Sequence, residues 1–181
     1  MRRSDRTGRR TLIGLAAVFA VLLVVNIIQS GESSKPRRLP FERVYPTMDD
    51  DDVQAVRLRA PSTNTTFTIT RAPDGRWLTP DHEGTLDQNA AVVIARTIAL
   101  LPYDRTVPQM GDLSDYGFES EGTMTLEAIM TSGETHGVLV GARAPSDSVY
   151  YALVDDRPEI YLIHRAAIDF LISQLRTPPV A

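Results

Sequence analysis

The chain lacks cysteine altogether, so disulfide bonds, thiolate metal sites and thiol nucleophiles are excluded. Histidine is scarce: His82, His136 and His164 lie far apart in the sequence, and no two of them have the spacing of a zinc site. Lysine is nearly absent too, since Lys35 is the single lysine among 19 basic residues. The composition therefore predicts no metal site and no other cofactor.

Sequence patterns of catalysis are also missing. No serine lies in a G-x-S-x-G context, and Gly137 and Gly141 are not followed by a helix whose N-terminus would bind a phosphate. The loop at residues 112–122 holds enough acids for a two-carboxylate hydrolase, but such loops are usually solvated surfaces. We therefore expect that the protein is not an enzyme.

Charge is divided unevenly along the chain. Residues 1–10 carry five arginines and one aspartate, a balance of +4, whereas the residues from Asp49 onward carry 10 basic and 20 acidic side chains, a balance of −10. A domain with this negative balance repels phosphate backbones, and its arginines are scattered among acids. Nucleic acid is therefore not expected as a partner.

The one long apolar run is TLIGLAAVFAVLLVVNII, the eighteen uncharged residues 11–28. A helix of this length rises about 27 Å, just enough to cross a hydrocarbon core. A cleaved signal peptide is the alternative, but its apolar part is normally shorter, and no small-x-small cleavage pattern follows here. We expect a transmembrane signal anchor in contact with membrane lipid. The protein is then a single-pass protein of the cell (inner) membrane. Its basic leader at residues 1–10 stays in the cytoplasm, and its C-terminal domain is extracytoplasmic.

Prolines and charge runs predict the domain boundaries. Residues 29–48 contain three prolines, three serines and no apolar period, so we expect a flexible tether. Residues 49–177 are expected to fold as one extracytoplasmic domain, and residues 178–181 form a tail. The four aspartates at residues 49–52 lack the alternate spacing and the glycine of a calcium loop, so a solvated turn is favoured there.

Hydrophobic periodicity predicts an α+β domain. Alternating side chains indicate strands at residues 53–60 and 65–71, and a Pro-Asp-Gly turn leads into a third strand at Trp77. Thr85 and Gln88 have the spacing of a capping box, and Pro102 ends the amphipathic helix that follows. The expected order is βββα followed by ββββα, with both helices packed on one face of an antiparallel sheet. The last four strands are expected at residues 123–130, 135–141, 148–154 and 159–163, and the second helix at residues 164–176.

Tyrosines of the last strands are the candidate contact residues. Tyr150 and Tyr151 are adjacent in one expected strand and therefore point to opposite faces, while Tyr161 lies in the next strand. Packing between strands is the ordinary role of such tyrosines, and only those that point outward can recognise a partner. The candidates for partner contact are Tyr150, Tyr151, Tyr161, Asp115 and Tyr116.

Other polar residues of this region are expected to lie apart. Asp155 and Asp156 are expected in a hairpin turn ahead of Pro158, and His164 at the start of the closing helix. Side chains in these positions need not converge. No catalytic site is therefore predicted among them.

Several short motifs occur in a distinctive order behind the apolar run. They are DGRW before a helix, SDYGFES, a strand ending in VLVG, APSDSVYYALV and EIYLI. In this order they resemble the bacterial family called domain of unknown function 4340 (DUF4340), over roughly Asp52 to Gln174. Members of that family show a tryptophan after a turn, a "yGl" step, an "iG" strand end, and "yY" and "vyli" strands. The chain resembles a short member with a single unit and an N-terminal anchor.

The resemblance implies a location at the membrane but no particular activity. The family has no established activity and no catalytic residues that can be carried over to this chain. Many members are longer and repeat such units. Members are often encoded beside ABC-transporter permeases of the gliding-motility type, which implies an accessory role at the membrane.

Two functions are expected on these grounds. The first is a membrane-anchored extracytoplasmic accessory or scaffold domain that binds another envelope or membrane-complex component without catalysis. The alternative is an extracytoplasmic domain that binds a small ligand or glycan through the acidic loop at residues 112–121 and the three tyrosines. A pocket lined by those residues favours the alternative, and a flat face favours protein contact.

Overall fold

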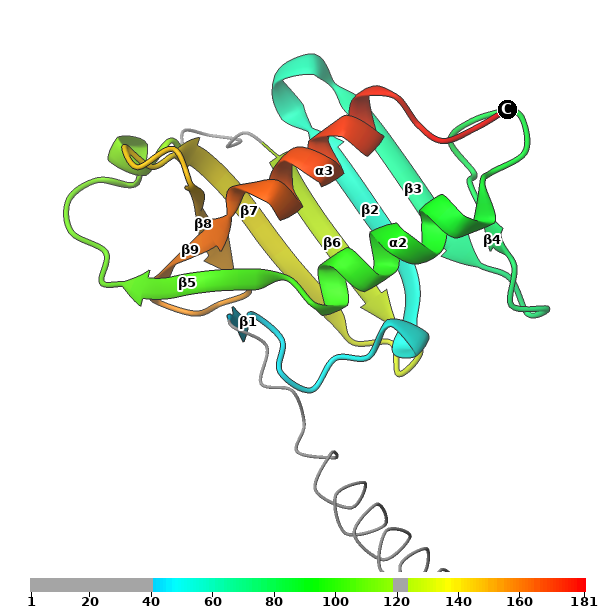
Figure 1. Ribbon diagram of the computed structural model, residues 1–181, viewed down its shortest axis with the longest axis horizontal. Coiled ribbons are helices and arrows are strands. Elements are labelled where there is room, and N and C mark those ends of the chain that lie inside the picture. The colour runs from blue at the N-terminus through cyan, green and yellow to red at the C-terminus, as the bar shows by residue number, and fades with distance from the viewer. Residues whose placement is uncertain (1–40, 119–123) are drawn as a thin grey trace, which may run out of the picture. The chain divides into compact units, whose positions relative to one another are not determined.

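A nine-stranded antiparallel sheet frames the part of the chain that the computed structural model describes, residues 41–118 and 124–181 (Figure 1). Across the sheet the strands follow the order β1-β5-β9-β8-β7-β6-β2-β3-β4. The strands are β1 (Glu42–Arg43), β2 (Val53–Ala60), β3 (Thr65–Arg71), β4 (Trp77–Leu78), β5 (Pro102–Val107), β6 (Met124–Met130), β7 (Thr135–Arg143), β8 (Val149–Val154) and β9 (Ile160–His164).

Both helices of the described residues, α2 (Gln88–Ala99) and α3 (Arg165–Arg176), lie across the same face of this sheet (Figure 1). We call it the covered face. Its side chains form one core with the helices, in which Leu58, Phe67 and Leu126 are fully buried. Because side chains alternate along a strand, every second residue of the central strands points to the other side. We call that side the open face, since neither α2 nor α3 lies on it.

The α+β class is confirmed, but the predicted order of elements is wrong. Within the described residues four strands precede α2 and five lie between α2 and α3, because the prediction misses β1 and β5. β1 has only two residues. β5 lies next to the sheet edge and exposes three of its six residues, so it lacks the alternation that marks a half-buried strand. The other predicted strands are present within one or two residues of their expected bounds.

The first helix begins differently from the prediction. Its N-cap is Asp87, whose carboxylate accepts hydrogen bonds from the backbone N–H groups of Asn89 and Ala90 at 2.8 and 3.2 Å. Thr85 therefore forms no capping box. Gln88, the other half of the predicted box, uses its side chain to bind the backbone of Trp77.

The predicted tether at residues 29–48 is wrong for residues 41–48, which belong to the folded unit that spans Phe41–Ala181. β1 pairs with β5, and the Val44 N–H donates to the Leu101 carbonyl at 2.9 Å. Val44, Tyr45 and Met48 are buried in the core. The domain therefore starts before Asp49. The burial of three side chains stabilises this segment on the sheet even though it contains prolines.

The predicted tail at residues 178–181 is also part of the fold. Val180 forms an antiparallel bridge with Leu86, and the backbones of Thr85 and Ala181 exchange hydrogen bonds of 2.9 and 3.1 Å. Gly84, at φ +118°, permits this close contact, because a Cβ there would lie 2.6 Å from the Ala181 oxygen. The last residues therefore close the loop that precedes α2.

The predicted membrane segment is not part of this unit. The leader at residues 1–10, the anchor at residues 11–28 and the tether at residues 29–40 lie outside the described residues. Within the described ranges, no helix is long and apolar enough to cross a membrane. The anchor therefore stays a prediction from the sequence.

Candidate functional site

The five candidate contact residues do not form one surface. Tyr150 and Tyr161 lie on the covered face and are only 4% and 8% exposed. Tyr151 lies on the open face, where its ring contacts that of Tyr116. Asp115 is exposed in the short 3-10 helix η4 (Leu113–Tyr116). The prediction that Tyr150 and Tyr151 point to opposite faces is confirmed, and it divides the candidates into two groups.

Tyr150 belongs to a hydrogen-bond network under α3. Its hydroxyl accepts from Arg143 Nε at 2.7 Å and donates to Asp169 Oδ1 at 2.8 Å. The second oxygen of Asp169 accepts from Arg165 Nε at 2.8 Å, and Arg165 also binds Asp147 at 2.6 Å. The network joins α3 to the β7–β8 hairpin, and the residues in it already satisfy one another.

The pKa shifts of Tyr150 and Asp169 follow from burial and from their contacts within this network. Burial raises the pKa of the Tyr150 hydroxyl above its ordinary value. The hydrogen bond from Arg165 lowers the pKa of Asp169, and the bond from Tyr150 and the charge of Arg143 act in the same direction. A groove of about 600 Å³ lies beside the network. The groove is lined by Arg143, Tyr150, Asp169, Ile172, Ser173, Gln174, Arg176 and Thr177.

Tyr161 belongs to a second cluster on the covered face. Arg157 donates to the Tyr161 hydroxyl at 2.9 Å and to the Val44 carbonyl at 3.0 Å, and its guanidinium lies 5.5 Å from the centre of the Tyr161 ring. The Tyr103 ring meets Tyr161 edge-on at 5.1 Å. A hydrogen bond to Glu42 raises the pKa of Tyr103 to about 12. Tyr161 therefore helps to hold residues 41–48 on the domain and offers no free contact surface.

A third group, centred on Asp155, is missed by the sequence prediction. The Asp155 carboxylate accepts from the Gly137 N–H at 2.7 Å and from the Tyr45 hydroxyl at 3.4 Å, and it lies 3.5 Å from His136 Nδ1. The other nitrogen of His136 lies 3.4 Å from Glu134. Burial is the main cause that raises the pKa of Tyr45 above its ordinary value. Both ring nitrogens of His136 therefore face carboxylates.

Two residues named with Asp155 in the sequence stay apart from it, as expected. Asp156 is exposed in the turn, and His164 lies at the end of β9 with its ring 6.1 Å from that of Phe41. Asp155 itself has a φ of +47°, a turn conformation that directs its carboxylate back to the sheet. The only signal in the sequence is an aspartate in a turn, because Tyr45 is 110 residues away.

The aspartate run at residues 49–52 forms a turn. Asp49 caps the 3-10 helix η2 (Asp50–Asp52), Asp50 pairs with Arg96 at 3.3 Å, and Asp51 lies 3.9 Å from Arg71. Across residues 41–118 and 124–181, no group of three or more histidine, cysteine, aspartate or glutamate side chains could hold a metal ion. These aspartates form and cap a short, solvated 3-10 helix.

The loop before β6 lies against the open face. The Tyr116 ring meets Tyr151 edge-on at 5.1 Å and stacks on Phe118 at 6.3 Å. The Tyr116 hydroxyl donates to the Met110 carbonyl at 2.7 Å and accepts from the Met110 N–H at 3.1 Å. Gly117 packs closely on Ala142 of β7. Tyr116 therefore fastens the loop to the sheet beside Tyr151.

Apolar side chains continue from this loop across the open face. Leu139 and Leu153 pair across β7 and β8 and are partly exposed. On the loop, Met110 is 70% and Leu113 is 38% exposed. Tyr151 packs against a small cluster of buried side chains that is separate from the main core. We call the exposed set the apolar patch; it consists of Met110, Leu113, Leu139, Tyr151 and Leu153.

Over the central parts of β2 and β6 the open face carries charged and hydroxyl side chains. Arg57 of β2 pairs with Glu127 of β6 at 2.9 Å, and both side chains are exposed to a third or more. Thr66 and Thr125 flank Arg59 in the adjoining positions of the ladder. The open face is therefore divided into an apolar half over β7 and β8 and a polar half over β2 and β6.

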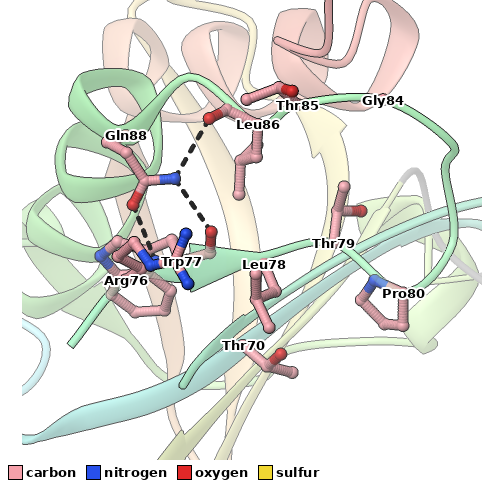
Figure 2. A pocket seen from close by; sticks show the side chains of 10 residues that line it. All are labelled: Thr70, Arg76, Trp77, Leu78, Thr79, Pro80, Gly84, Thr85, Leu86 and Gln88. Atoms are coloured by element: carbon pink, nitrogen blue, oxygen red, sulfur yellow. Dashed lines mark hydrogen bonds between the residues drawn. The ribbon is translucent and has the colours of Figure 1, made fainter. Parts of the chain in front are cut away.

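The edge of the sheet at β4 holds a further groove, of about 460 Å³ (Figure 2). Gln88 Oε1 accepts from the Trp77 N–H at 2.8 Å, and its Nε2 donates to the carbonyls of Trp77 and Leu86 at 2.9 and 3.1 Å. The amide thus takes the place of a neighbouring strand on the outer side of β4. The groove is lined by Thr70, Arg76, Trp77, Leu78, Thr79, Pro80, Gly84, Thr85, Leu86 and Gln88.

Comparison with known families gives a single finding. A family described as "Domain of unknown function (DUF4340)" matches residues 77–177. The match begins at Trp77 and includes α2, α3, the network around Tyr150 and the apolar patch, whereas β1, β2 and β3 precede it. No curated protein and no solved structure matches the chain.

Proposed function

The chain belongs to the DUF4340 family, and from this premise we propose that it is a membrane-anchored, extracytoplasmic accessory domain. In this role it binds another component of the envelope or of a membrane complex and has no catalysis of its own. The observation that carries the proposal is the open face. Two helices bury one side of the sheet, while the apolar patch on the other side stays partly exposed.

An exposed apolar patch next to a polar surface is typical of a protein contact site. Met110 and Leu113 project from a loop that Tyr116 fixes to the sheet, so they are held in place before a partner arrives. Preorganised contacts of this kind reduce the entropic cost of association. The position of the patch therefore supports binding of a protein.

The predicted membrane anchor indicates where the domain binds its partner. If residues 11–28 cross the membrane, only residues 29–40 separate the bilayer from the folded unit that begins at Phe41. Twelve residues span at most about 40 Å when fully extended. The partner is then a membrane protein or lies close to the membrane, and an ABC-transporter complex fits the setting that the resemblance implies.

Binding of a small ligand or glycan is the second candidate. The groove of about 600 Å³ next to Tyr150 is the observation that favours it. Arg143 and Asp169 of that groove are, however, already bound to each other and to Tyr150. None of residues 112–118, the described part of the acidic loop, lines this groove. Protein contact is therefore the better supported function.

Affinity purification from detergent-solubilised membranes tests the proposal. The intact protein is compared with a version in which a cleavable signal replaces residues 11–28. We expect one envelope or membrane protein to be retained by both forms, which assigns the contact to the domain. Retention of no such protein, together with hydrolysis of a generic ester or glycan panel by the purified chain, would overturn the proposal.

A further inference from the structure

The charge around the apolar patch describes the partner that it fits. Between Pro108 and Phe118 the loop has two acidic residues, Asp112 and Asp115, and neither lysine nor arginine. The two carboxylates flank Leu113 on the loop that carries the exposed part of the patch. Neither carboxylate takes part in an ion pair among the described residues, and Asp112 does not use its side chain to cap η4.

Asp112 and Asp115 differ in this respect from the acids of η2 and of the α3 network. There Asp50 is paired with Arg96 and Asp169 with Arg165. Unmatched carboxylates next to exposed leucine and methionine repel anionic surfaces and attract cations. An anionic lipid surface and a nucleic acid therefore both fit this border poorly.

We propose that the partner is a protein whose contact surface is apolar and is bordered by arginine or lysine, and that it docks on Met110, Leu113, Tyr151 and Leu153 with its cations against Asp112 and Asp115. This inference rests on the proposed function and specifies its surface. The apolar side chains provide the contact area, and the carboxylates select a basic partner. A second copy of this chain is disfavoured, because its own patch is acidic too.

Site-specific photo-crosslinking in the native membrane tests the inference with the full-length chain. A benzoylphenylalanine replaces Leu113, Leu153 or, as a control on the exposed side of α2, Asn89. We expect the first two positions to crosslink the same envelope or membrane protein, at a segment that contains arginine or lysine. The yield at Asn89 should be lower by about tenfold, because that position lies on the covered side of the sheet.

Charge reversal provides the second measurement. In the background of the Leu153 crosslinker, the double substitution Asp112→Lys and Asp115→Lys should lower the yield about five- to tenfold. Emission from Trp77, the only tryptophan, shows whether the variant is folded, since the indole is buried in the native state. Arg57→Glu on the polar half of the open face is the matched control and should leave the yield unchanged.

The outcomes separate the inference from the proposed function. Equal crosslinking from Asn89, an unchanged yield after charge reversal, or a product that is a second copy of this chain overturns the inference. A partner that crosslinks only from Asn89 leaves the proposed function standing and removes this surface. Crosslinking from no position, with no protein retained in the affinity purification, defeats both.

Discussion

Tyr150 and Tyr151 are neighbours in the chain, yet they lie on opposite faces of the sheet and differ in their contacts. On the covered face, the Tyr150 hydroxyl binds Arg143 and Asp169 under α3. On the open face, the Tyr151 ring rests against Tyr116, and its hydroxyl has no hydrogen bond within the described residues. The comparison shows that side-chain alternation gives one tyrosine a structural task and leaves the other available for contact.

The largest difference between the faces is expected for leucine. Leu126→Ala on the covered face should lower the free energy of unfolding by about 2–5 kcal/mol, because the residue is fully buried and leaves a cavity. Leu139→Ala on the open face should cost about 1 kcal/mol or less, since Leu139 is partly exposed. Urea unfolding of the purified chain, followed by Trp77 fluorescence, measures both. Equal losses would show that the open face is covered in solution.

The second prediction concerns the sheet edge at β4, where the Gln88 side chain binds the backbone of Trp77. Gln88→Ala leaves the backbone N–H and C=O of Trp77 without their partner, so we expect a loss of about 1–2 kcal/mol in unfolding free energy. Asn89→Ala, one residue further along α2, is the matched control and should cost less than about 0.5 kcal/mol. If both variants unfolded at the same urea concentration, Gln88 would not be closing this edge.

The tyrosine pair provides a direct test of the comparison. Tyr150→Phe removes the hydroxyl that links Arg143 to Asp169, and a loss of about 1 kcal/mol is expected. Tyr151→Phe should leave stability unchanged, because its hydroxyl has no hydrogen bond in the described part of the chain. The same unfolding measurement compares them. A larger loss for Tyr151→Phe would reverse the roles that are assigned here to the two faces.

The smallest expected effect is a dependence on pH. Because the folded-state pKa of Asp169 lies below its ordinary value of 3.8, the folded protein holds this proton less tightly than the unfolded chain. The stabilisation is therefore present above about pH 4 and is lost as the pH falls through the lower, folded-state pKa. Asp169→Asn should flatten the fall in melting temperature between pH 5 and pH 3.

Asp156→Asn removes the same charge and serves as the control for this measurement. Asp156 is exposed in the β8–β9 turn and has no ion pair within the described ranges. Its substitution should leave the slope of melting temperature against pH as it is in the parent protein. An identical slope for parent, Asp169→Asn and Asp156→Asn would mean that the α3 network contributes nothing to acid stability.

Much of the fold can be predicted from local patterns. The strands around Leu126 and Ala152 alternate between buried and partly exposed positions, so their periodicity is strong. Weakly patterned elements escape prediction. β5 exposes half of its residues, and the buried residues Val44 and Tyr45 lie between prolines in a segment whose composition predicts a tether.

The site is harder to predict, because its members come together only through long-range packing. Asp155 contacts Tyr45 from 110 residues away, and no local pattern connects them. Tyr161 lies in a strand, as predicted, but Arg157 and Tyr103 occupy its outward side. Sequence distance conceals such contacts, since register and strand order decide which side chains meet.

The sequence by itself determined the absence of thiol chemistry, the acidic balance of the domain, the family motifs and the alternation that separates Tyr150 from Tyr151. These properties depend on residue type and on neighbours along the chain. Only the tertiary structure decided that α2 and α3 cover one face, that Tyr161 is enclosed and that Leu139 and Leu153 stay partly exposed. The physical reason is that a strand has two equivalent sides until the packing of helices buries one of them.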